Sequence, residues 1–293
     1  MDSKEQASSS VAMAEPEGKS GRVIKVGRVG RSNLLVTLSA VLAIMILAVV
    51  ADRQMPTADY LSSVSFAADN QRGWAAGEKG TILAATNGGT SWRAQTSGTT
   101  NNLSSVIFAA DGQRGWASGE KGTILATTNG GTSWRAQPSG TSNGLGEVSF
   151  AADGQRGWAV GGRGTILATT NGGTNWQAQP SGTSNDLWEV SFAADGQRGW
   201  VVGSRGTILA TTNGGTSWQA QTSGTTNSLL SVSFAADGQR GWTVGDRGTI
   251  LATTTGGMTW QLQPSGTTAA ATLIRVAMQQ PCGVYGACAQ GGL

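Results

Sequence analysis

The chain has 293 residues, of which 38% are hydrophobic and 13% charged, with 45 glycines, 11 tryptophans and no histidine. Disordered chains are richer in charge and poorer in large apolar side chains, so this composition excludes general disorder and favours many short strands joined by glycine-rich turns. The formal charge of +3 arises largely from residues 1–51, with six basic and four acidic residues, and the near-neutral remainder lacks the basic bias of a nucleic-acid binder.

The first predicted element is an uncharged apolar run at residues 34–51. As a helix it would be about 27 Å long, which is close to the thickness of a bilayer hydrocarbon core. Five basic residues precede the run, namely Lys19, Arg22, Lys25, Arg28 and Arg31. By the positive-inside rule, residues 1–33 form a cytoplasmic basic tail, and the chain after the transmembrane helix lies on the periplasmic or lumenal side of the membrane.

A cleaved signal peptide is the alternative interpretation of residues 34–51. Val49 and Ala51 provide the small-residue pattern that precedes a cleavage site, and the cut would fall before Asp52. The length of the run, and of the segment before it, favours the uncleaved anchor of a single-pass membrane protein. Both interpretations export the repeats that follow, and residues 52–60 form a linker to them.

A repeat of 42 residues fills residues 61–270 in five complete copies. Two tryptophan series share this period, and all five phenylalanines occupy one position of the repeat. The first series is Trp74, Trp116, Trp158, Trp200 and Trp242; the second is Trp92, Trp134, Trp176, Trp218 and Trp260. The phenylalanines are Phe66, Phe108, Phe150, Phe192 and Phe234. A period of about 40–45 residues is typical of a four-stranded propeller blade.

Each repeat divides into four predicted strands. In the third repeat these are residues 147–151, 158–160, 164–170 and 176–179, separated by glycine-rich turns. The alternation in the first strand and the many glycines exclude a helical alternative. One such sheet cannot bury both of its faces, whereas sheets packed side by side around an axis can. The sequence therefore predicts an all-β fold, a β-propeller of four-stranded blades with the periodic aromatic side chains packed between blades.

The repeat continues into a partial sixth copy at residues 271–293. Ile274 and Val276 fall where valine and phenylalanine lie one repeat earlier, but the last residue corresponds to the middle of a blade. We expect a five-bladed ring with this half-repeat as an appendage, and an incomplete six-bladed ring is the alternative. Cys282 and Cys288 lie in this tail, where an oxidising compartment permits a disulfide between them; two free thiols are equally compatible with the sequence.

The turn before the second tryptophan of the repeat resembles the Asp-box motif of sialidase-type propellers, S-x-D-x-G-x-T-W. Residues 127–134 read TTNGGTSW, and the same match recurs at residues 169–176 and 211–218. Asparagine replaces the aspartate of the motif in four repeats. Its side-chain oxygen can accept the amide hydrogens of the turn, so the box is a folding device and implies no activity.

A longer pattern resembles the photosystem II assembly and stability factor family. In the third repeat it comprises Gly157-Trp158-Ala159-Val160-Gly161, then Gly164-Thr165-Ile166-Leu167, then Thr170-Asn171-Gly172-Gly173 and Trp176. The resemblance covers about residues 61–266 and implies an exported, non-enzymatic, cofactor-free propeller. Its partner would be a protein, such as a membrane complex or a newly made reaction-centre polypeptide that it helps to assemble. The family's propeller has seven blades and its cyanobacterial members usually carry a lipid-modified cysteine, and the sequence departs from both patterns.

An enzyme of the sialidase or glycosidase class is the main alternative to a binding protein. Such a site needs an arginine cluster, a tyrosine nucleophile and carboxylates, but Tyr60 and Tyr285 lie at opposite ends of the repeats. The absence of histidine removes the commonest general base and metal ligand. We therefore expect no enzymatic activity, no metal site and no cofactor. Glycan binding and a purely structural role in the cell envelope remain as further alternatives.

Two connections on one predicted face differ between repeats, and they contain the candidate partner-binding residues. The connection after the second strand keeps a base in every repeat: Lys79, Lys121, Arg163, Arg205 and Arg247. Ring symmetry would arrange these bases as a positive circle, unless they are only solvated turn charges. The start of each first strand is the other variable connection, and it contains Glu147, Trp188 and Glu189 in the third and fourth repeats.

Trp188 is the tryptophan that belongs to neither periodic series. The other repeats place serine, glycine or leucine at its position, so packing does not require an indole there. Tryptophan and arginine are the residues most enriched at interface hot spots. The sequence therefore predicts a protein-binding site centred on Trp188 with Arg163 and Arg205 nearby, the alternative being that Trp188 fills a local gap between blades.

Overall fold

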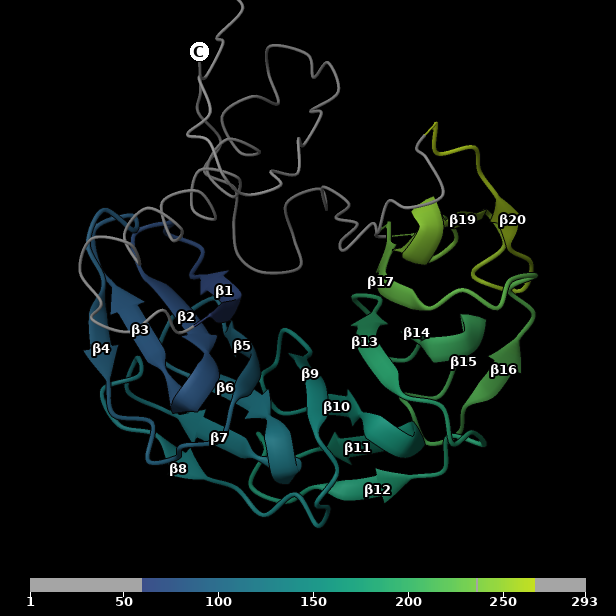
Figure 1. Cartoon of the computed structure of the whole chain (residues 1–293). Helices are drawn as coiled ribbons and strands as arrows, with labels where there is room; N and C mark the ends of the chain where they lie inside the picture. The colour runs from purple at the N-terminus through teal and green to yellow at the C-terminus, as the bar shows by residue number, and fades with distance from the viewer. Residues whose placement is uncertain (1–59, 236, 267–293) are drawn as a thin grey trace, which may run out of the picture. The chain divides into compact units, whose positions relative to one another are not determined.

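The computed structural model describes residues 60–235 and 237–266, and these form five four-stranded antiparallel sheets (Figure 1). The all-β fold and the four-stranded blades predicted from the repeat are thereby confirmed. The basic tail, the apolar run at residues 34–51, most of the linker, the half-repeat at 271–293 and both cysteines lie outside the described residues. Among the described residues, no helix is long and apolar enough to cross a membrane.

Within each blade the strands follow chain order from the inner to the outer strand. The first blade consists of β1 (Leu61–Phe66), β2 (Gly73–Gly77), β3 (Ile82–Ala85) and β4 (Arg93–Gln95). The second consists of β5 (Leu103–Phe108), β6 (Gly115–Gly119), β7 (Ile124–Thr127) and β8 (Arg135–Ala136). The third consists of β9 (Leu145–Phe150), β10 (Gly157–Gly161), β11 (Thr165–Thr169) and β12 (Gln177–Gln179). The fourth consists of β13 (Leu187–Phe192), β14 (Gly199–Gly203), β15 (Ile208–Thr211) and β16 (Gln219–Gln221). The fifth consists of β17 (Leu229–Phe234), β18 (Gly241–Gly245), β19 (Ile250–Thr253) and β20 (Gln261–Leu262).

A short 3-10 turn joins the second strand of each blade to the third. These turns are η1 (Glu78–Gly80), η2 (Glu120–Gly122), η3 (Gly162–Gly164), η4 (Ser204–Gly206) and η5 (Asp246–Gly248). Each turn requires its closing glycine: Gly164 has φ +69°, and a Cβ built on it would overlap the carbonyl oxygen of Thr183. Only glycine satisfies both conditions without strain.

Every first strand contains a β-bulge near its start. In the fourth blade, Leu187 pairs with Gly203 and Glu189 pairs with Val202, so Trp188 between them has no partner on β14. A bulged residue is released from the alternation of the strand, which re-aims its side chain. The bulge therefore explains why this repeat position tolerates serine, glycine, tryptophan and leucine.

The periodic aromatic residues form the junctions between successive blades. The Trp158 ring stacks on Phe192 of the next blade with 3.5 Å between ring centroids, and its N–H donates to the carbonyl of Gly214 at 3.0 Å. Phe192 meets the edge of Trp218 in its own blade at 5.9 Å. The stacked centroids are 3.4–3.6 Å apart at all four junctions between consecutive blades. The prediction that these residues make the inter-blade core is confirmed.

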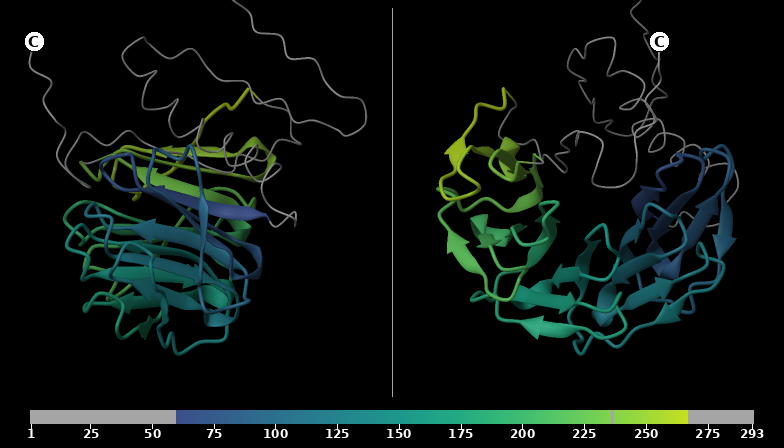
Figure 2. Two further views of the ribbon diagram at one scale, coloured as in Figure 1. Left: turned by 90° about the vertical axis from the view of Figure 1, so that its left-hand side faces the viewer. Right: turned by 180° about the vertical axis from the view of Figure 1, so that it is seen from behind.

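Successive blades pack through their inner strands, with β1 beside β5, β5 beside β9, β9 beside β13 and β13 beside β17 (Figure 1; seen from behind in Figure 2). In the described part of the chain, the fifth blade does not pack on the first in this way. The four junctions share one geometry, because the same stacked pair sets each of them, and together they leave β17 apart from β1. The closed five-bladed ring expected from the sequence is therefore not formed by the described residues.

Candidate protein-binding rim

The five turns η1–η5 present their bases in one repeated backbone conformation. Lys79, Lys121, Arg163, Arg205 and Arg247 all have φ between 52° and 55°, in the left-handed region, and all five side chains are exposed. The surrounding hydrogen bonds hold this conformation. In η3, the Gly162 N–H donates to Gly144 at 2.9 Å, and the Thr165 hydroxyl donates to Gly162 at 2.7 Å. The positions of these five bases are thus determined by backbone geometry as well as by side-chain rotamers.

The turns lie against the starts of the first strands, and together they form one surface, here termed the rim. It comprises η1–η5, the five bulged residues Ser62, Ser104, Gly146, Trp188 and Leu230, and the residues beside these at the strand starts, among them Asp186, Glu147 and Glu189. The Arg163 N–H donates to the Asp186 carboxylate at the start of the next blade at 2.9 Å, and η3 packs against β13. The structure therefore brings the backbone of Arg163 to the start of the blade that contains Trp188.

Trp188 is one of the few large apolar side chains of the described chain that lie open to solvent, with 40% of its surface exposed. The corresponding residue of the preceding blade is Gly146. A Cβ added to Gly146 would contact the backbone of Trp188. Because Gly146 has no side chain, nothing from that position covers the indole. This exposure distinguishes Trp188 from Trp158 and Trp200, which are 2% exposed.

Glu147 and Glu189 contribute to the blade junctions. The Val190 N–H donates to the Glu147 carboxylate at 2.8 Å, and the Val232 N–H donates to the Glu189 carboxylate at 2.8 Å. In the same way, the Val106 N–H donates to the Ser63 hydroxyl at 3.1 Å. These acceptors satisfy N–H groups at the exposed edge of each inner strand, which would otherwise be left unpaired. Sequence reasoning missed this role, although the serine at the same position of other repeats was a usable signal.

The charges of the rim are mixed. The five bases are accompanied by six carboxylates: Glu78, Glu120, Asp246, Glu147, Asp186 and Glu189. The positive circle expected from ring symmetry is therefore not present, because an acid precedes the base in η1, η2 and η5. Glycine and serine take that place in η3 and η4, and among the described residues no carboxylate lies within 4.0 Å of the Arg163 or Arg205 guanidinium. Arg163 lies on the blade that precedes Trp188, and Arg205 lies on the same blade as Trp188.

Asp186 is a rim residue that the sequence analysis did not single out. Its carboxylate fixes the backbone of η3 from the next blade, and Asn102 makes the same contact to Lys79 at 2.9 Å. The equivalent positions before the other first strands hold Tyr60, Gly144 and Ser228. A comparison of the repeats at this position could have found it, because asparagine and aspartate occur there in some repeats and small residues in others.

The opposite face contains a repeated aspartate–arginine pair. In the third blade the Asp153 carboxylate accepts the N–H groups of Gln155 and Arg156 at 2.8 and 3.0 Å, and the Arg156 Nε at 3.0 Å. Arg156 also donates to the Gly196 carbonyl of the next blade at 3.2 Å. Partial burial raises the pKa of Asp153, but these hydrogen bonds and the guanidinium outweigh it, so the pKa lies below its ordinary value. The pair is therefore structural.

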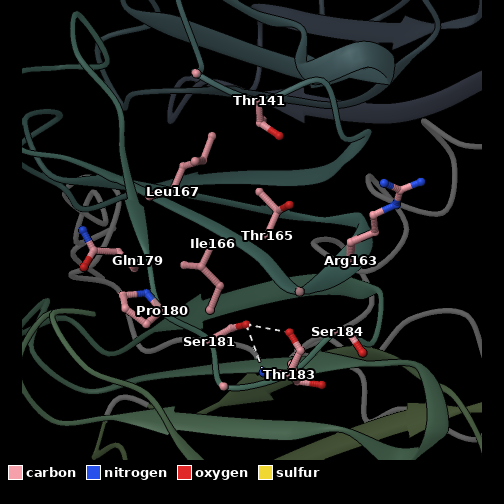
Figure 3. A pocket seen from close by; sticks show the side chains of 14 residues that line it. Thr141, Arg163, Thr165, Ile166, Leu167, Gln179, Pro180, Ser181, Thr183 and Ser184 are labelled. Carbon is pink, nitrogen blue, oxygen red and sulfur yellow. Dashed lines mark hydrogen bonds between the residues drawn. The ribbon is translucent and has the colours of Figure 1, made fainter.

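A hollow of about 600 Å³ lies beside Arg163, between the outer connections of the second and third blades (Figure 3). Its lining includes Thr141, Thr165, Ile166 and Gln179, and Arg163 is the only ionisable residue in it. General acid–base catalysis of glycoside hydrolysis requires two carboxyl groups. This hollow lacks that pair, so it offers polar and apolar contact area but no such chemistry.

Comparison with known proteins identifies the family. The profile described as photosynthesis system II assembly factor YCF48 matches residues 48–139 and 134–222. The chain belongs to this family. The resemblance inferred from the repeat pattern is thereby confirmed, and the family match covers more than half of the chain. No curated protein matches the sequence.

Among solved structures, the chain is similar to YCF48 proteins and to glycoside hydrolases. It is 24% identical to YCF48 bound to a D1 peptide, with 71% of this chain and 83% of that chain covered and a TM-score of 0.40. YCF48 from Cyanidioschyzon merolae is 19% identical, with coverages of 74% and 89% and a TM-score of 0.48. The GH74 enzyme of Niastella koreensis is 22% identical, with coverages of 71% and 32% and a TM-score of 0.55. The likeness to GH74 enzymes shows a shared propeller fold alone.

Proposed function

We propose that this chain is a non-enzymatic, exported propeller that binds a protein segment at the rim and assists the assembly of a membrane protein complex. Membership of the YCF48 family supports the assembly role. The observation that carries the binding site is the exposed indole of Trp188, on a strand that packs against the turn containing Arg163. The proposed topology is a cytoplasmic tail at residues 1–33 and one membrane span at 34–51, with the repeats on the periplasmic or lumenal side.

The rim suggests the chemistry of the partner segment. An apolar side chain on Trp188 would remove the exposed 40% of the indole from water, which is the main favourable contribution expected. Arg163 and Arg205 have no carboxylate partner among the described residues and can each bind one from the partner. The proposed ligand is therefore an apolar segment with an adjacent acidic group, such as a reaction-centre polypeptide offers at an end or a loop.

Capture from detergent-solubilised membranes of the source organism tests this proposal. The immobilised propeller should retain a specific membrane protein, and Trp188→Ala should weaken that retention at least tenfold, which corresponds to about 1.4 kcal/mol. The double variant R163E/R205E should weaken it further, most strongly at low salt. Arg93→Glu is the matched control, because Arg93 is an exposed base on the outer strand β4, away from the rim.

Three outcomes would contradict the proposal. Equal capture by wild type and Trp188→Ala, with both folded, would move the site away from the rim. Recovery of no specific partner would favour a structural role in the cell envelope. Turnover of a fluorogenic glycoside or sialoside panel would favour the glycosidase alternative.

A further inference from the structure

Each blade offers the next blade the same three groups. The tryptophan of its second strand supplies a ring face and an N–H, and the arginine of its first turn supplies a guanidinium. In the fourth blade, Trp200 stacks on Phe234 at 3.4 Å and donates to Gly256 at 2.9 Å. Arg198 donates to the carbonyl of Asp237 at 3.1 Å. A face that carries these groups is built to hold a following blade.

The fifth blade carries the same groups without a described acceptor for them. Trp242 is only half-buried, and among residues 60–235 and 237–266 it has neither a stacked phenylalanine nor an acceptor for its N–H. Arg240 has 60% of its side chain exposed, whereas the arginines at this position in the other four blades have 31–34%. The fifth blade therefore ends in a junction face that no described blade covers.

The sequence after the fifth blade has the register of a sixth. Ile274 and Val276 lie 42 residues after Val232 and Phe234, which belong to the same buried cluster as Trp200 at the preceding junction. We infer that residues 271–277 dock on the fifth blade as the inner strand of a sixth blade, with Ile274 and Val276 covering Trp242. This places the half-repeat within the propeller, in contrast to the appendage expected from the sequence.

A second copy of the chain is the competing occupant of this face. Its first blade would offer Leu61, Val64 and Phe66, which are less buried than their equivalents in the second blade. The tethered segment has the advantage, because the connection from β20 to residue 271 is only one residue longer than the connection from β16 to β17. A short tether gives an effective concentration of the order of millimolar, far above that of a second protein molecule in dilute solution.

Hydrogen exchange on the full-length protein tests the inference. The amides of residues 272–277 should exchange at least about 100-fold more slowly than an unstructured chain, because docking pairs or buries them. Val276→Asp should abolish this protection, since it places a charge against the Trp242 ring. Arg275→Asp is the matched control: side chains alternate along a strand, so residue 275 faces away from the fifth blade and its substitution should preserve protection.

Two results would overturn the inference. The first is exchange of residues 272–277 at the rate of an unstructured chain in the wild type. The second is protection that depends on protein concentration and coincides with dimer formation, which would make a second copy the occupant. Trp242→Ala provides an independent check. If Ile274 and Val276 cover Trp242, this variant should also lose the protection of residues 272–277. The five described blades should remain folded, because Trp242 takes no part in the four junctions between them.

Discussion

The stacked tryptophans between blades predict a large loss of stability for Trp158→Ala. Trp158 is 2% exposed, its ring lies 3.5 Å from that of Phe192, and its N–H is bonded to Gly214. Truncating a buried tryptophan to alanine costs about 3–5 kcal/mol. The hydrogen bond contributes about 1 kcal/mol and the aromatic pair about 0.5–1.5 kcal/mol beyond buried area, so the upper part of that range applies.

This loss translates into a measurable shift in melting temperature. For a domain of roughly this size, about 1 kcal/mol corresponds to about 2–4 °C, so Trp158→Ala should lower Tm by at least about 8 °C. Trp158→Phe should fall between wild type and alanine, because it keeps a ring on Phe192 but leaves the Gly214 carbonyl without its donor. Thermal unfolding followed by circular dichroism measures both variants.

Trp188→Ala is the internal control, since it removes the same side chain from the neighbouring blade. Trp188 is 40% exposed and lies at a bulge, so its removal should cost less than about 1 kcal/mol. The reasoning is refuted if Trp158→Ala and Trp188→Ala lower Tm by similar amounts. It is also refuted if Trp158→Ala leaves Tm within about 2 °C of the wild type.

The remaining predictions concern a turn, an aspartate and the membrane topology. Gly164→Ala should lower Tm more than Gly182→Ala in thermal melts, because both have φ near +70° but only at Gly164 would the new Cβ meet backbone. Since the folded-state pKa of Asp153 is depressed, its stabilisation is present above the ordinary value of 3.8 and is lost as pH falls below it. Asp153→Asn should therefore lower Tm at pH 7 and show a smaller further loss in melts between about pH 5 and pH 3. Protease added to spheroplasts should remove the repeats and leave a small membrane-anchored fragment that contains residues 34–51; protection of the repeats would contradict the proposed export.

The blades were predictable from the sequence because their determinants are local and repeated. A hairpin between adjacent strands needs only glycines at the turns and alternation within the strands, and 42-residue periodicity marks both. The tryptophan junctions were predictable for a related reason: a large apolar residue at one position of every repeat must be buried by the neighbouring blade. The exposed position of Trp188 followed from its departure from that pattern.

Features that depend on contacts between blades were harder to predict from the sequence. The carboxylate of Glu147 reaches an N–H 43 residues away, and a glutamate in one repeat does not reveal whether it faces solvent or a strand edge. The contact between Asp186 and the turn of Arg163 was likewise hidden, because it depends on how successive blades meet. Closure of the ring depends on small rotations summed over several junctions, and no single residue encodes that sum.

The near-identity of the four junctions also has a consequence for how such a protein can change. Each blade presents a phenylalanine on one side and a tryptophan on the other, so any blade can pack on any other. Gaining or losing one whole 42-residue repeat therefore keeps the remaining junctions intact. Blade number is then free to drift by unequal exchange of repeats, with little effect on the packing of each blade. Trp188 is the exception, because only the fourth repeat contains it. Loss of that repeat would remove the proposed binding site and still leave a well-packed protein.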